Sequence, residues 1–269
     1  MKRFIGIQKL PFTLLLVLAI SCSEDFLDVI PTAAVSQPIL ANENGINSLL
    51  IGAYAAIDGA GLQVNGWHGS WAWAGSVSNW IWGSVASDDG TKGSDITDSF
   101  QAYNIEDYTV NADHSFLNDK WCANYEGVSR SNEVLKLIGT ATLVPGEKLI
   151  QYKAEAMFLR AWFHFELKRV FNNIPYITEN VDPATVTNKT DAWPMIEADL
   201  QFAVDHLPVN QSDLGRPTRY AAMAVLARVH LFQQEWQDAA DLLDAIMASG
   251  KYSLMPNFDD NYLIAKRNN

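Results

Sequence analysis

Tryptophans are concentrated in one short stretch of this sequence. Five of the nine fall within sixteen residues, at Trp67, Trp71, Trp73, Trp80 and Trp82. An indole ring can stack on the C–H face of a sugar, while neighbouring carboxylates or amides hydrogen-bond the sugar hydroxyls. A tryptophan also buries a large area wherever it lies, so packing of the protein's own core explains the same residues equally well. We therefore expect some of the five in the core and one or two exposed to a ligand.

Acidic residues follow this stretch at Asp88, Asp89, Asp95 and Asp98. Their carboxylates could bind Ca²⁺, which takes about six to eight oxygen ligands, but the spacing of an EF-hand loop and its closing Glu are absent. Capping of a loop is the favoured interpretation. Adjacent carboxylates such as Asp88 and Asp89 rarely flank a glycosidic bond at roughly 5–9.5 Å, as a glycoside hydrolase requires. Asp95 is retained as a candidate for hydrogen bonding to a sugar.

The remaining titratable residues form no catalytic set. Glu155 and Arg160 fall in the middle of a predicted helix, where a buried polar tie between helices is the favoured interpretation. His164 and His230 occupy matching positions of an internal repeat, so packing explains them better than metal ligation. No Ser lies in a Gly-x-Ser-x-Gly context, and there is no Gly-rich phosphate-binding loop. We expect no enzymatic activity, no cofactor and no metal site.

Composition and charge narrow the class of protein. The chain has 269 residues, of which 48% are hydrophobic and 19% charged, as in a globular protein with a sizeable core. The net charge is −12; Lys2, Arg3 and Lys9 precede any acidic residue, so the rest carries −15 (16 basic against 31 acidic residues). Such an acidic body has no electrostatic footprint for a phosphate backbone, which argues against nucleic-acid binding. Two Cys residues provide no disulfide framework.

The amino terminus has the features of an export signal. A basic lead precedes an apolar run from Leu10 to Ile20, which is too short for a bilayer-spanning helix of roughly 20 residues. The run ends in Leu18-Ala19-Ile20-Ser21-Cys22, which resembles a bacterial lipobox with Ala19 where Leu is usual. The acidic Ser23-Glu24-Asp25 that follows resembles the surface-export signal of Bacteroidetes lipoproteins. We predict a signal peptide over 1–21, lipidation of Cys22, and a tether over 22–41; an ordinary signal peptide is the alternative.

Periodic apolar residues predict a mainly helical chain. One helix begins at Asn42 and is stopped by Gly59, and others cover 116–138, 148–170, 191–207, 218–233 and 236–249. Residues 172–190 contain two prolines and short β-branched runs, so an extended excursion is expected there. Strand signals are few. The predicted fold class is all-α, with long irregular loop insertions.

A degenerate repeat indicates how these helices associate. Leu159-Arg160-Ala161-x-x-His164 is echoed by Val225-Leu226-Ala227-x-x-His230, and Ala198-Asp199-Leu200 by Ala240-Asp241-Leu242. Small residues at such positions let paired helices approach closely, as in tetratricopeptide repeats. We predict tetratricopeptide-like helix pairs over 148–250; a generic antiparallel bundle is the alternative.

Three blocks together resemble the SusD/RagB family. The first runs from Glu155 to Leu167 and closes with Phe171-Asn172-Asn173-Ile174-Pro175. The second joins Gly215-Arg216-Pro217-Thr218 to Leu226-Ala227-Arg228 and Ser249-Gly250-Lys251-Tyr252. The third lies upstream and consists of Ser87-Asp88-Asp89, Lys92-Gly93, Trp121, Tyr125, Arg130, Ser131-Asn132 and Leu135. The blocks occur in family order behind the lipoprotein signal.

The resemblance implies a non-catalytic lipoprotein on the outer face of the outer membrane. It would capture a glycan and deliver it to a SusC-type TonB-dependent transporter, with no nucleic acid involved and only a lipid anchor in the membrane. Family members are about twice as long, which implies that 42–269 is the amino-terminal half and that the carboxyl-terminal half is absent. Sugar-stacking aromatics in the family follow the Asp-Asp block, where this chain has only Phe100.

The expected ligand-binding residues are therefore Trp67, Trp71, Trp73, Asp95 and Phe100. Peptide capture by the same architecture is one alternative function. A protein–protein scaffold, in which the helices do the only binding, is another. A glycan-cleaving enzyme would need a carboxylate pair that the sequence does not supply.

Overall fold

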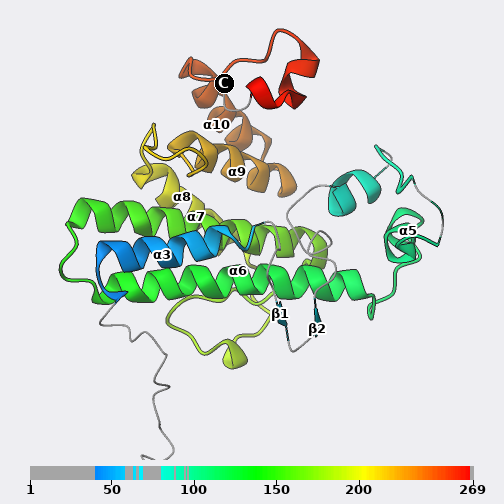
Figure 1. The fold of residues 1–269 in the computed structure, drawn as a ribbon, viewed down its shortest axis with the longest axis horizontal. Coiled ribbons are helices and arrows are strands. Elements are labelled where there is room, and N and C mark those ends of the chain that lie inside the picture. The colour runs from blue at the N-terminus through cyan, green and yellow to red at the C-terminus, as the bar shows by residue number, and fades with distance from the viewer. Residues whose placement is uncertain are drawn as a thin grey trace, which may run out of the picture. The chain divides into compact units, whose positions relative to one another are not determined.

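Helices make up most of the structure, a computed structural model that describes residues 40–57, 63–64, 67–68, 80–87, 89–93, 95 and 97–266. The α-helices of this part of the chain (Figure 1) are α3 (Glu43–Tyr54), α5 (Phe100–Glu106), α6 (Ser115–Thr140), α7 (Gly146–Phe171), α8 (Trp193–His206), α9 (Arg219–Phe232) and α10 (Trp236–Ala248). Shorter elements are the π-helix η2 (Trp80–Val85), the 3₁₀ turns η3 (Pro183–Thr185), η4 (Phe258–Tyr262) and η5 (Ile264–Lys266), and an antiparallel pair of strands, β1 (Gln63–Val64) and β2 (Trp67–His68). The predicted all-α class is confirmed. Across the described ranges, no helix has both the length and the apolar character needed to cross a bilayer.

Local hydrogen bonds explain where the predicted helices begin and end. The side-chain oxygen of Asn42 accepts a hydrogen bond from the Gly45 amide at 3.1 Å, and Thr218 caps α9 in the same way from the Ala221 amide at 3.2 Å. Asn172 ends α7 with a positive φ of 59°, which Asn tolerates better than most residues. The first helix stops at Tyr54, ahead of the expected Gly59.

Helix α7 is the centre of the fold because its side chains are buried on several faces. One face packs with α3 and α6 around a cluster that includes Leu50, Leu135 and Phe163. Another packs with α8 and α9 around a cluster that includes Phe165 and Leu200. Consecutive helices from α6 to α10 contact one another along the chain, which gives the predicted stacked pairs (Figure 1).

The sequence pattern does not predict α5 or η2. Both are short, and Ser99, which precedes α5, has a left-handed φ of 52° and makes no capping hydrogen bond through its side chain. They are held instead by tertiary contact, because Phe116 at the start of α6 is fully buried against Ile81, Val85 and Ile105. This packing fixes the region that follows the tryptophan-rich stretch.

Candidate functional site

The predicted ligand-binding residues are described to different extents. The backbone of Trp67 lies in β2, where it pairs with Val64. Trp71 and Trp73 lie outside the described residues, as do the predicted signal peptide, Cys22 and most of the tether. Asp95 lies on the segment between η2 and α5, Phe100 is the first residue of α5, and both are exposed. Their role in ligand binding stays a prediction.

The loop that carries Asp95 is fixed from both sides. The Asp95 carboxylate accepts hydrogen bonds from the Thr97 amide at 2.8 Å and from the Thr97 hydroxyl at 2.7 Å, and these bonds lower the pKa of Asp95. The Lys92 ammonium group donates to the Asp95 carbonyl oxygen at 2.5 Å, and the Lys92 amide donates to Glu106 at 2.8 Å. Asp95 thus caps a turn, as the sequence favoured, and the turn is tied to α5.

Exposed aromatic residues precede and follow this loop in the sequence. Phe100 and Tyr103 lie one turn apart on α5 and are 57% and 38% exposed. Tyr108, which is 70% exposed, donates from its hydroxyl to the Ala86 carbonyl oxygen at 3.3 Å, so it bridges the ends of α5 and η2. Trp80 is 45% exposed at the start of η2. Rings of this kind present flat apolar faces of the size of a sugar ring.

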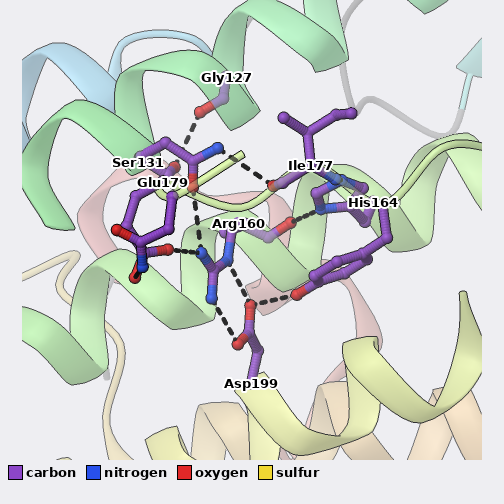
Figure 2. A network of polar contacts seen from close by, with 10 residues as sticks. Gly127, Ser131, Arg160, His164, Ile177, Glu179 and Asp199 are labelled. Atoms are coloured by element: carbon purple, nitrogen blue, oxygen red, sulfur yellow. Dashed lines mark hydrogen bonds and ion pairs between the residues drawn. The ribbon is translucent and has the colours of Figure 1, made fainter. Parts of the chain in front are cut away.

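A buried polar network surrounds Arg160, which belongs to the Glu155–Leu167 block on α7 (Figure 2). Arg160 on α7 forms a two-point ion pair with Asp199 on α8, at 2.7 and 2.8 Å. It also donates to Asn132 on α6 at 3.1 Å and to Glu179 at 2.5 Å. Although burial opposes ionisation of Glu179, a hydrogen bond from its own backbone amide and the Arg160 charge together hold the pKa of that carboxyl below its ordinary value. The prediction that Arg160 is a buried tie between helices is confirmed.

This network also docks the extended excursion onto the helices. The Asn132 amide donates to the Ile177 carbonyl oxygen at 3.1 Å, and the Ile177 amide donates to Nε2 of His164 at 3.1 Å. Nδ1 of His164 lies 2.9 Å from the Arg160 carbonyl oxygen, so it carries the proton. Burial, together with the Arg160 charge, lowers the pKa of His164 to about 3. His164 is therefore neutral and structural, as expected.

A second polar network explains the Gly-Arg-Pro-Thr block. Arg216 donates to the buried carboxylate of Glu155 at 3.0 Å and to Asn47 at 2.6 Å. The Tyr54 hydroxyl donates to the same Glu155 oxygen at 2.7 Å. Gly215 has a φ of 92°, a value that L side chains rarely adopt, and this turn directs Arg216 toward α7. The block therefore fastens the α8–α9 connection to α3 and α7.

The buried ion pair between Lys120 and Glu166 was not predicted from the sequence. Lys120 on α6 is fully buried, and its ammonium group lies 2.7 Å from Glu166 on α7, which also pairs with Arg169 at 2.9 Å. Burial lowers the pKa of Lys120 despite the adjacent carboxylate. Lys120 itself gives no sequence signal of burial, because lysine is rarely buried unless paired.

The chain is similar in sequence and in fold to several known proteins. The sequence model of a SusD-like family, described as "Starch-binding associating with outer membrane", matches residues 25–231. SusD-like protein P25 of Formosa agariphila is 23% identical over 274 residues, covering 94% of this chain and 48% of that protein. A laminarin-binding SusD-like protein of known structure is 25% identical with a TM-score of 0.72, over 85% of this chain and 50% of that one. Surface glycan-binding protein A from Bacteroides fluxus is 27% identical with a TM-score of 0.69, over 84% and 48%. The chain spans about half the length of these relatives.

Proposed function

Because this chain belongs to the SusD-like family, we propose that it captures a glycan at the outer membrane and delivers it to a SusC-type TonB-dependent transporter. The observation that carries the proposal is the family match over residues 25–231, which includes every helix of the α3–α8 framework and most of α9. Likeness to a laminarin-binding structure supports a glycan as the ligand. The role is binding without catalysis: the buried carboxylates Glu155, Glu166 and Asp199 are each held in ion pairs between helices.

The glycan-binding surface of this proposal is the aromatic region around α5. Phe100 and Tyr103 offer exposed rings on one helix face, and the turn tied to α5 presents Asp95 beside them in the chain. Trp67, Trp71 and Trp73 are proposed to extend this surface. Stacking of rings on sugar faces, and hydrogen bonds that the Asp95 carboxylate accepts from sugar hydroxyls, suit a neutral polysaccharide, which an acidic protein does not repel.

Binding to a panel of polysaccharides tests the proposal. Affinity electrophoresis and calorimetry against laminarin and starch, with a mixed peptide digest as the alternative ligand, are expected to give saturable glycan binding. Phe100→Ala should weaken it about tenfold, which corresponds to about 1.4 kcal/mol. Phe258→Ala removes an aromatic of similar exposure elsewhere in the chain and should leave the affinity unchanged. Binding of peptides alone would move the proposal to peptide capture, and equal binding by both variants would exclude the α5 surface.

Anchoring and partnership need a separate test in the native membrane. We propose that Cys22 carries the lipid, so Cys22→Ala should release the protein from the membrane fraction. Mild-detergent purification of the wild type is expected to recover a large TonB-dependent barrel. Recovery of the intact, surface-exposed protein without any barrel would contradict delivery to a transporter.

Exposed apolar residues at the carboxyl-terminal helices favour a second candidate, protein–protein contact. Leu243 and Met247 lie one turn apart on α10 and are exposed, and Phe232 at the end of α9 is half exposed. Exposed large apolar side chains on neighbouring helices are a feature of protein–protein interfaces. If the protein acts as a scaffold, it should bind a partner protein even where it binds no glycan.

A further inference from the structure

Three potential metal ligands from three elements converge at one end of the α8–α9 pair. They are Glu197 on α8, His230 near the end of α9, and Glu235, which immediately precedes α10. One ligand atom from each lies within 4.8 Å of the other two. Glu197 is far from the other two residues in the sequence, and the repeat position of His230 predicted only a packing role for it.

The turn between α9 and α10 creates this convergence. Gln234 has a left-handed φ of 64°, and the Glu235 amide donates back to the His230 carbonyl oxygen at 2.9 Å. The chain reversal places Glu235 Oε2 2.6 Å from His230 Nδ1. From the other side, Gln233 donates to Glu197 at 2.5 Å, which holds the α8 carboxylate against the same turn.

We propose that Glu197, His230 and Glu235 bind a divalent transition-metal ion, of which Zn²⁺ is the test case. One imidazole and two carboxylates are ligands that Zn²⁺ takes at about 2.0–2.2 Å. Donors at that radius on a tetrahedron lie roughly 3.3–3.6 Å apart. The His230 Nδ1–Glu235 Oε2 separation of 2.6 Å is shorter than this and no separation among the three ligand atoms exceeds 4.8 Å, so the site requires rotations of the side chains to open around the ion. Glu235 is 41% exposed, which leaves a fourth position for water.

The chemistry of the donors selects against the abundant hard cations. Ca²⁺ and Mg²⁺ prefer all-oxygen sites with six or more ligands, whereas an imidazole nitrogen favours Zn²⁺ and its neighbours in the transition series. The bound ion would join α8 to the α9–α10 turn and stabilise the folded chain by mass action. This inference is independent of glycan capture.

The alternative is that the three residues only hydrogen-bond one another, and carboxamide variants separate the two explanations. Glu235→Gln keeps an acceptor for His230, and Glu197→Gln keeps one for Gln233, but both remove a metal-binding charge. His230→Gln removes the imidazole. His206→Gln, on α8, removes a histidine whose ring bonds and stacks within its own helix at Phe202.

The experiment titrates Zn²⁺ into the tag-free, chelator-treated chain by calorimetry and follows the melting temperature with Zn²⁺ or with EDTA. We expect one saturable site per chain and a rise in melting temperature that EDTA reverses. Glu235→Gln, Glu197→Gln and His230→Gln should each lose at least about tenfold in affinity, the lower range for disturbing a metal's surroundings. His206→Gln should bind like the wild type. Absence of Zn²⁺ binding, or equal affinity in all variants, would overturn the proposal.

Discussion

Arg160 shows how much one side chain can determine in this protein. It is buried and joins α6, α7, α8 and the excursion through Asn132, Asp199 and Glu179. A buried ion pair adds little net stability over an apolar pair, but removing one partner leaves the other charge buried and uncompensated. The network therefore specifies how the helices fit together more than it strengthens them.

Arg160→Met is predicted to lower the free energy of unfolding by about 3–5 kcal/mol, because the buried Asp199 carboxylate then loses its ionic partner. Urea denaturation followed by circular dichroism measures this change. Lys136→Met, which breaks an exposed pair with Glu133, should cost less than about 1 kcal/mol. Combining Arg160→Met with Asp199→Leu should recover part of the loss. If Arg160→Met costs no more stability than Lys136→Met, the buried network does not stabilise the packing of the helices.

His164 makes a second prediction at the residue scale, in pH dependence. Its pKa is about 3 in the folded protein and about 6.5 when unfolded, so between these values the unfolded chain binds more protons. Stability from this residue is complete above about pH 6.5 and should fall by up to about 1.4 kcal/mol per pH unit on acidification toward pH 3. His164→Gln should be less stable at neutral pH yet flatter between about pH 6 and 4. Urea midpoints at several pH values test this, and parallel pH profiles would contradict it.

At the scale of elements, the contact between α6 and α7 depends on one glycine. Gly127 lies on α6 where a Cβ atom would come within 2.4 Å of the Phe163 ring. The absence of a side chain at this position lets the two helices approach closely. Gly139 lies on the same helix with open space around the equivalent atom.

Gly127→Ala is therefore predicted to destabilise the fold by about 1–3 kcal/mol through overpacking, despite the better helix propensity of Ala. Gly139→Ala should instead stabilise it by roughly 0.5–1 kcal/mol. Thermal unfolding of the two variants beside the wild type gives both signs. Stabilisation by both substitutions would mean that α6 and α7 are not packed as closely as described.

At the scale of the molecule, exposed large apolar side chains gather toward the end of the described chain. They include Leu243, Met247, Leu254, Phe258 and Ile264. Exposed apolar side chains favour association with whatever apolar surface is available. In a purified sample the available surface is another copy of the chain.

We predict that the purified chain self-associates with rising concentration, and that Leu243→Glu with Met247→Glu restores the 29.9 kDa monomer. Leu143→Glu, at an exposed apolar position between α6 and α7, is the matched control and should leave association unchanged. Sedimentation velocity over a concentration series distinguishes these outcomes. A wild type that stays monomeric throughout would show that the apolar surface is not sufficient for association.

The sequence by itself determined the helices from α6 to α10 and the family resemblance. Intervals of three and four between Trp121, Tyr125, Val128, Asn132 and Leu135 are a local signal, because an α-helix bonds residues four apart and buries one stripe. The mid-helix positions of Glu155 and Arg160 likewise indicated buried ties, since charged residues on an apolar face need partners.

Only the tertiary structure decided which partners those residues have. Asp199 lies 39 residues from Arg160, and Arg216 lies 61 residues from Glu155, so neither pair has a local spacing that could be recognised. Helix α5 and η2 exist because Phe116 packs on them, and Lys120 is buried because α6 turns it toward Glu166. Glu197, His230 and Glu235 meet only through the α9–α10 turn and the packing of α8 on α9. Periodicity specifies which face of a helix is buried, but the rotation and pairing of helices, which bring distant side chains within bonding distance, follow from packing of the whole core.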